Sequence, residues 1–320
     1  MSSIKIDTVE FRKSKDFIQS KLTLKMSGKK ATCILANTFR RIALDDIPTY
    51  AFAYVNIEQN TSILNNDMMN LRLKQLPIYD MECPVIFLHP KYWQDVNYSD
   101  LNREKHESEK SIEAIINSTN TTNNVLNVTT DDIKYYVDNE EIQYPARNKK
   151  EPILLLQLRP SETFKCQMKG CLGVAECDNM WSAANIAYYE EKDGDILFSI
   201  ESANQISEYE IMRKACKLIK LKLHGIENEI KNRLAIKEIE HTQIIFFDLI
   251  NEDHTMGNLI NDELQNHKDI VFAGISKPDH LIKQIRFKIC SDKSVKSPIN
   301  AFFDVLSDLE KLITNIEKQL

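Results

Sequence analysis

Two short stretches near opposite ends of the chain look like two versions of one structural device, and they constrain the fold more than any other feature. They read ANTFRRIAL at residues 36–44 and HTMGNLINDEL at residues 254–264. An alignment without gaps that places Asn37 on Asn258 also places residues 51–54 on residues 272–275. A unit that recurs at a long period usually packs against its own copy. The sequence therefore predicts a chain built from two related halves.

The elements around the two motifs repeat in the same order. Each motif follows a strand-like apolar stretch, at residues 21–26 and 242–248, and a long amphipathic helix lies well downstream of each. This shared order favours two copies of one α/β unit over an accidental match of short motifs.

Helical periodicity is clearest in three segments. Residues 32–45 form the first, which Pro48 ends. Ser207 and Glu210 have the spacing of a capping box that starts a long second helix, and Pro298 stands at the first position of a third. The stripe of the second helix is Ile211, Ala215, Leu218, Ile219, Lys222, Ile226, Ile230 and Leu234; that of the third is Phe302, Val305, Leu306, Leu309, Ile313, Ile316 and Leu320. Two such stripes predict a core that both halves share.

The middle of the chain is less regular. Aromatic and β-branched residues predict a strand at residues 50–57, and further strands are expected at 133–137 and 153–158. A helix within residues 58–80 is expected to start at caps in residues 65–67 and to bury the apolar face of Met68, Leu71, Leu73 and Leu76. The polar tract from 98 to 130, above all 101–124, predicts an exposed excursion, and KGCLG at 169–173 predicts a turn.

Charge and hydropathy exclude some classes of protein. The chain has 320 residues, and 41 basic minus 47 acidic residues give a net charge of −6, without the basic footprint of a protein that binds duplex DNA. The basic run at residues 147–150 is interpreted as a solvated loop. No apolar run approaches the roughly 20 residues that a membrane-spanning helix needs, and the start lacks a signal-peptide core. We expect a soluble intracellular protein.

The seven cysteines contain no CxxC pair. A disulfide framework is not expected in a chain of this size and compartment. Cys166, Cys171 and Cys177, with Cys83 or His89, have the right chemistry for zinc or an iron–sulfur cluster, but their spacing fits neither signature. We therefore predict no metal and no cofactor.

The second motif and its sequel carry a family resemblance. EDHTMGNL at residues 252–259, VFAG at 271–274 and Pro278 resemble the small assembly subunit of cellular RNA polymerases, which is the eleventh-largest subunit of RNA polymerase II and the archaeal L subunit. The resemblance spans residues 240–320 in the right order, including the closing helix.

The first half resembles the partner of that subunit: the third-largest subunit of RNA polymerase II, the archaeal D subunit and the amino-terminal domain of bacterial alpha. The matching blocks are ANTFRR with DIPT (36–41, 46–49), EQNTSIL with LPI (58–64, 76–78), and KGCLG with WSA (169–173, 181–183). In the family these are separate chains, whereas here both patterns stand in one chain, as in the fused subunit of some large cytoplasmic DNA viruses. The single cysteine after the LPI block, Cys83, does not support the zinc loop of cellular relatives.

The resemblance implies an α+β fold in which two related halves form an alpha-like pseudo-heterodimer joined through long helices, with a mainly β domain inserted in the first half. The implied boundaries are 1–45 with 180–234 for the first half, 46–179 for the inserted domain, and 235–320 for the second half.

Two sets of site residues follow from the resemblance. The expected large-subunit interface contains Arg40, Arg41, Lys169, Gly170, Gly173 and Trp181. The expected dimerisation core contains Asn37, Phe39, Leu218, Gly257, Asn258, Leu259, Phe302 and Leu309. Ordinary solvated charge remains the alternative for the arginines, and a plain turn remains the alternative for the KGCLG block. His254 has no paired nucleophile or acid at a fixed offset, so we expect a cap or a packing residue and no catalytic residues.

The leading hypothesis is a non-catalytic subunit of a DNA-directed RNA polymerase. It is a platform for the largest and second-largest subunits and for small accessory subunits, and it has no sequence-specific contact with nucleic acid and none with membrane. It would be monomeric alone, and if viral it would occur in the virion and the host cytoplasm. The alternatives are a free-standing homodimeric scaffold or regulator that retains the fold, and a metal-dependent enzyme that uses the cysteines with His89 or His254.

Overall fold

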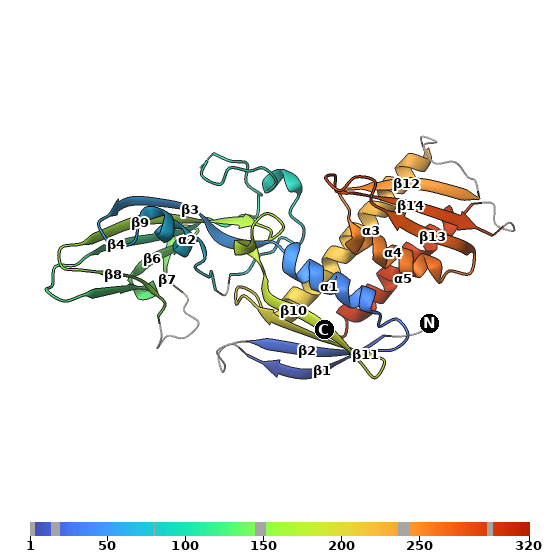
Figure 1. The fold of residues 1–320 in the computed structure, drawn as a ribbon, viewed down its shortest axis with the longest axis horizontal. Coiled ribbons are helices and arrows are strands. Elements are labelled where there is room, and N and C mark those ends of the chain that lie inside the picture. Colours follow the sequence, from blue (N-terminus) through green and yellow to red (C-terminus); the bar gives the residue numbers. More distant parts are fainter. Residues whose placement is uncertain are drawn as a thin grey trace.

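The computed structural model describes residues 4–13, 20–79, 81–100, 102–144, 152–235, 243–292 and 297–320. The molecule is elongated, with a β-rich body at one end and two helix-covered sheets toward the other (Figure 1). The basic run at 147–150 and the first residue of the strand expected at 242–248 lie outside the described residues.

The first half is a four-stranded antiparallel sheet covered by two helices. Its strand order is β1-β2-β11-β10, with β1 at Lys5–Arg12, β2 at Lys21–Ser27, β10 at Ala184–Lys192 and β11 at Asp195–Ser202. Alternate residues of β2 and β11, such as Leu22, Leu24 and Phe198, are fully buried on the inner face. Helix α1 (Cys33–Asp45) packs on β10, and α3 (Glu208–Ala235) packs on α1.

The second half repeats this plan with fewer strands. Its sheet has the order β12-β14-β13, with β12 at Ile244–Ile250, β13 at Ile270–Ser276 and β14 at Gln284–Ser291. Helix α4 (His254–Gln265) lies against β13, and α5 (Ile299–Glu317) places Phe302 edge-on against the rings of Phe247 and Phe287. Aromatic rings in this arrangement attract one another beyond the effect of their burial.

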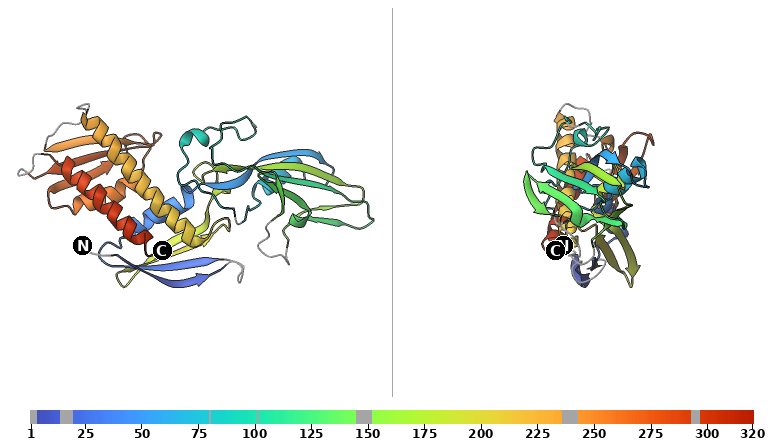
Figure 2. Two further views of the ribbon diagram at one scale, coloured as in Figure 1. Left: turned by 180° about the vertical axis from the view of Figure 1, so that it is seen from behind. Right: turned by 90° about the vertical axis from the view of Figure 1, so that its left-hand side faces the viewer.

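One hydrophobic core joins the two halves. It takes residues from both sheets and from α1, α3, α4 and α5. Helix α1 packs on α4 and α3 packs on α5, and the two long helices run side by side in the view from behind (Figure 2). Ion pairs Lys30–Glu263 and Lys220–Glu317 also cross between the halves. This arrangement confirms the α+β pseudo-heterodimer within one chain.

The inserted body has its own core. Its five-stranded sheet has the order β3-β9-β4-β6-β7, and a two-stranded sheet pairs β5 with β8. The strands are β3 (Thr49–Asn60), β4 (Ile112–Thr119), β5 (Leu126–Thr129), β6 (Ile133–Val137), β7 (Glu140–Gln143), β8 (Leu154–Leu158) and β9 (Thr163–Gly173), with α2 at Asn66–Lys74 and short 3-10 turns at Pro90–Tyr92, Thr130–Asp132 and Asn179–Trp181. The boundaries 46–179, 1–45 with 180–234, and 235–320 are our proposal for the three units.

Two polar contacts tie the inserted body to the first half. The Gln205 side chain donates to the carbonyl of Tyr50 and accepts from its N–H, both at 2.8 Å, as a neighbouring strand would. The buried Lys214 of α3 donates its ammonium to the carbonyls of Cys83 and Val85. Because the Lys214 ammonium bonds the carbonyls of two buried residues, the segment after α2 is held against α3.

Three sequence predictions for this body are wrong. KGCLG at 169–173 ends the long strand β9 instead of forming a turn. The polar tract conceals β4, which lies within the five-stranded sheet and buries Ile112, Ala114 and Ile116. Of the four residues expected on the apolar face of helix α2, Leu73 and Leu76 are buried, but Met68 and Leu71 are exposed and Met69 is buried in their place. No helix of the described residues is long and apolar enough to span a bilayer.

Candidate subunit interface and charged junction

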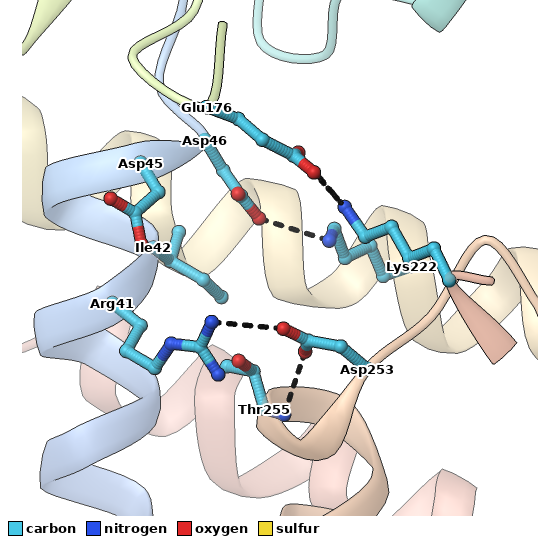
Figure 3. Close-up of a pocket in the computed structure, with 9 residues that line it drawn as sticks. Arg41, Ile42, Asp45, Asp46, Glu176, Lys222, Asp253 and Thr255 are labelled. Carbon is cyan, nitrogen blue, oxygen red and sulfur yellow. Dashed lines mark hydrogen bonds and ion pairs between the residues drawn. The ribbon is translucent and has the colours of Figure 1, made fainter. Parts of the chain in front are cut away.

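A cluster of opposite charges lies where the three parts of the chain meet. It lines a cavity of about 70 Å³ (Figure 3). Lys222 of α3 lies 2.9 Å from Asp46, just after α1, and 3.6 Å from Glu252, just before α4. Lys283, before β14, bonds Glu176, which follows β9, at 2.6 Å and 2.8 Å. Lys222 therefore bridges one carboxylate that follows α1 and another that precedes α4.

Burial and crowding change the proton affinities in this cluster. Burial raises the pKa of Glu252 to about 7. The negative charges of Asp46 and Asp253 add to this rise, and the ammonium of Lys222 offsets it only in part. Burial alone would lower the pKa of Lys222, but the adjacent carboxylates Asp46 and Glu252 raise it above its usual value. One cation facing two partly buried carboxylates leaves an excess negative charge. Glu252 is the group that takes up a proton near neutral pH.

Replacing Glu252 with glutamine is expected to change how stability depends on pH. Its folded pKa lies above the ordinary value of 4.5, so the folded chain holds the extra proton between these values and wild-type stability falls as pH rises from about 4.5 through 7. Glu252→Gln removes this loss, which is up to about 3 kcal/mol. Urea unfolding at pH 5, 6, 7 and 8 should show that the free energy of unfolding of the variant increases relative to that of the wild type as pH rises. Parallel curves would contradict the assignment.

Asp253 has two partners at the start of α4. Its side chain caps the helix by accepting from the Thr255 N–H at 2.7 Å, and it pairs with Arg41 of α1 at 2.9 Å. Burial alone would raise the pKa of Asp253, but the Thr255 N–H and Arg41 outweigh it and hold the pKa below its usual value. The residue thus connects the motif helices of the two halves.

The two bonds of Asp253 can be separated by substitution. Asp253→Ala removes both and is expected to lower the free energy of unfolding by about 1–2 kcal/mol, as loss of an N-cap does. Asp253→Asn keeps an acceptor for the Thr255 N–H and loses only the charge, so we expect less than about 1 kcal/mol. Chemical unfolding at pH 7 distinguishes them. Equal losses in both variants would show that the ion pair, and not the cap, carries the effect.

The structure separates the six expected large-subunit interface residues into two groups. Arg40, Arg41 and Lys169 keep partly exposed side chains, and Arg40 donates to the Asn37 side chain at 3.0 Å. Gly170, Gly173 and Trp181 are buried. A Cβ on Gly170 would meet Ile112 at 2.8 Å, and one on Gly173 would meet the Trp181 ring at 2.4 Å. Close packing explains these three residues, so we keep only the charged three as candidates for contact with a partner.

Most residues of the expected dimerisation core are buried in the structure. Phe39, Leu218, Leu259, Phe302 and Leu309 are at most 3 % exposed, and Gly257 is also buried. Asn258 is exposed and lies outside this core, because the buried face of α4 runs through its neighbours Gly257 and Leu259. Asn37 is half-buried, and its side-chain oxygen accepts from Arg40 on the next turn of α1.

The role of Lys222 was not predicted from the sequence. The residue was expected only as one member of an apolar stripe, whereas the structure places it at the centre of the charged junction. A lysine on the buried face of a helix was the available signal, because a buried ammonium needs partners, which are carboxylates for Lys222 and backbone carbonyls for Lys214.

The three cysteines considered as ligands do not converge. Cys166 and Cys171 are buried in β9, and Cys177 is exposed after it. Burial raises the pKa of the Cys166 thiol to about 12, which disfavours the thiolate that binds metal. Within the described ranges no group of three His, Cys, Asp or Glu side chains is placed to hold a metal ion.

The fold and the junction define a class of protein: an assembly subunit made of two dimerisation domains that pair with each other. Comparison with known families agrees. The sequence pattern of the RNA polymerase Rpb3/Rpb11 dimerisation domain matches residues 25–223, and a second such pattern matches residues 245–319. The first match covers more than half of the chain, which belongs to this family.

Individual relatives cover the whole chain or one half of it. A protein of Acanthamoeba polyphaga mimivirus, named provisionally as a DNA-directed RNA polymerase subunit, is 26% identical over 97% of this chain and 91% of its own length. The polymerase subunit Rpo3 of Methanocaldococcus jannaschii is 22% identical over 63% of this chain and 87% of its own. The RNA polymerase II subunit rpb11 of Dictyostelium discoideum is 24% identical over 31% of this chain and 81% of its own. The viral relative matches nearly the full length of this chain, and the cellular ones match parts of it.

Proposed function

We propose that the chain is a non-catalytic assembly subunit of a multisubunit DNA-directed RNA polymerase and docks the two large catalytic subunits. The observation that carries the proposal is the pair of dimerisation domains packed on each other within one polypeptide. Such a pair presents two different outer surfaces in a fixed relation. This geometry suits a platform that holds two unlike partners.

The proposed function includes particular partners and a place in the cell. A large catalytic subunit is the proposed partner of Arg40 and Arg41, and the second-largest subunit is that of Lys169; these planar or flexible cations suit contact with carboxylates and carbonyls. The largest subunit and small accessory subunits complete the complex. The viral relative supports an origin in a large DNA virus, and hence a place with the transcription machinery in the virion and the host cytoplasm.

Copurification tests the platform. A tagged chain expressed in its native setting is expected to recover both large polymerase subunits in stoichiometric amounts. Recovery of neither would end the proposal. Sedimentation of the chain alone separates it from a homodimeric scaffold, because a chain that satisfies its own pairing surface is expected to be monomeric. A stable homodimer that recovers no polymerase subunit would favour the scaffold.

A further inference from the structure

The outer face of the second-half sheet exposes large apolar side chains. Helices α4 and α5 cover the inner face, while Phe246 of β12 and Phe272 of β13 are 57% and 50% exposed on the outer one, beside Val271 at 70%. The Phe272 ring lies over Gly274, where an added Cβ would meet it at 2.9 Å. The absence of a side chain at Gly274 thus leaves room for a flat apolar surface.

A single lysine lies between the two exposed rings. The ammonium of Lys288, on β14, is 5.5 Å from the centre of the Phe246 ring and 5.8 Å from that of Phe272, within reach of a cation–π attraction. No carboxylate of the described residues forms an ion pair with it. The next cation along β14, Arg286, is paired with Asp248 at 2.7 Å and 2.9 Å. The outer face therefore carries one uncompensated charge at the centre of its apolar part.

The corresponding face of the first-half sheet provides an internal comparison. There Thr23 bonds Ser199 across the strands, Lys25 pairs with Asp195 at 2.7 Å, and Lys21 donates to Tyr188 at 3.1 Å. Both sheets bury apolar side chains inward in the same way, but the first-half outer face has an exposed aliphatic side chain, Ile186, beside these polar pairs, whereas the second-half face exposes the cluster around Lys288. Fold stability does not require that difference, and exposed apolar patches commonly mark contact surfaces.

We propose that this outer face docks a segment of another polymerase subunit whose apolar side chains surround one Asp or Glu. This inference rests on the proposed function. The charge chemistry selects this occupant. Burying Lys288 under a wholly apolar partner would leave an ammonium without a counter-charge, which is strongly unfavourable. A carboxylate placed over Lys288 neutralises it while the flanking apolar groups cover Phe246 and Phe272.

Site-specific crosslinking tests the occupant. The photoreactive residue benzoylphenylalanine replaces Phe246 in the tagged full chain, expressed in its native setting, and the adduct is mapped by mass spectrometry. The matched control places the same residue at Tyr188, an aromatic position 37% exposed on the polar face of the first half. We expect position 246, and not 188, to crosslink to a polymerase-subunit peptide in which an acidic residue is flanked by apolar ones.

A charge reversal completes the test. Lys288→Glu is expected to reduce recovery of the crosslinked subunit by about tenfold or more, as loss of a central interface residue does. Lys25→Glu, on the polar face, is expected to leave recovery unchanged. Circular dichroism melting confirms that both variants fold.

Each remaining outcome overturns the inference. The inference fails if the adduct forms only with a second copy of the chain, or with a peptide that has no carboxylate. It also fails if no adduct forms in the assembled complex, or if the folded Lys288→Glu variant recovers the subunit fully. If the wild-type chain recovers no large subunit, the proposed function fails first and the inference fails with it. Recovery of large subunits without the crosslink removes the inference alone.

Discussion

Replacing Trp181 with alanine is expected to lower the free energy of unfolding by about 3–5 kcal/mol. The indole is 1% exposed, lies tilted against the Tyr98 ring with ring centres 4.7 Å apart, and donates its N–H to the Cys171 carbonyl at 2.9 Å. Its removal would leave a cavity where the inserted body joins the first half. Urea unfolding followed by circular dichroism measures the loss, since the substitution removes one of the two tryptophans.

Two glycine substitutions test how tightly the Trp181 indole is packed. Gly173→Ala adds a Cβ that would lie 2.4 Å from the Trp181 ring, and a rigid indole cannot move aside, so we expect a loss of about 1–3 kcal/mol. Gly225→Ala places the same methyl group on α3 where no atom lies within 4 Å, and it should be neutral or stabilise by up to about 1 kcal/mol. Equal responses at the two glycines would show that the Trp181 contact is not tight.

Replacing Lys222 with methionine is expected to destabilise the chain by about 3 kcal/mol, the lower end of the effect of removing one partner of a buried ion pair. Methionine keeps most of the length of the side chain but leaves Asp46 and Glu252 facing each other without a cation. The loss should be larger at pH 8 than at pH 5, because protonation relieves the repulsion between the carboxylates. Chemical unfolding at the two pH values measures it.

A double variant isolates the electrostatic part of the Lys222 effect. In Lys222→Met with Glu252→Gln, one of the two opposed carboxylates is neutral, so part of the lost stability should return at pH 8. Lys231→Met is the matched control, because Lys231 pairs with Glu227 on the exposed surface of the same helix and is expected to change stability by less than about 0.5 kcal/mol. No recovery in the double variant would assign the Lys222 effect to packing.

The helices were predictable because their signals are local. The first motif helix was expected at 32–45 and is observed at Cys33–Asp45, with the Thr32 side chain accepting from the Leu35 N–H. The third was expected from Pro298 and begins at Ile299. Caps, a helix-starting proline and the helical period all act within a few residues, so the sequence contains them directly.

The strands of the inserted body depend on neighbours distant in sequence. Gly170 and Gly173 suggested a turn, but in β9 they make room for Ile112, which belongs to the earlier strand β4, and for Trp181, which follows the end of β9. The alternation of Ile112, Ala114 and Ile116 in β4 was obscured by the polar composition around it. Tertiary packing decides such segments, because strand preference depends on cross-strand partners.

The charged junction could not be found from spacing. The whole inserted body lies between Asp46 and Lys222 in the sequence, and the end of α3 and all of β12 lie between Lys222 and Glu252. Arg41 and Asp253 likewise belong to different halves. Only the pairing of the two halves brings these residues together. The family resemblance predicted that pairing, but it did not predict which charges the pairing would enclose.

Covalent connection changes the thermodynamics of the pairing between α1 and α4 and between α3 and α5. Two separate chains with these surfaces would dissociate on dilution and expose to water the apolar side chains that the α1–α4 and α3–α5 contacts bury. Within one polypeptide the partner is always present at an effective concentration that is roughly millimolar for short flexible linkers. Pairing then becomes a first-order step with a fixed one-to-one stoichiometry. Complex assembly therefore starts from a ready pair even when few copies of the chain have been made.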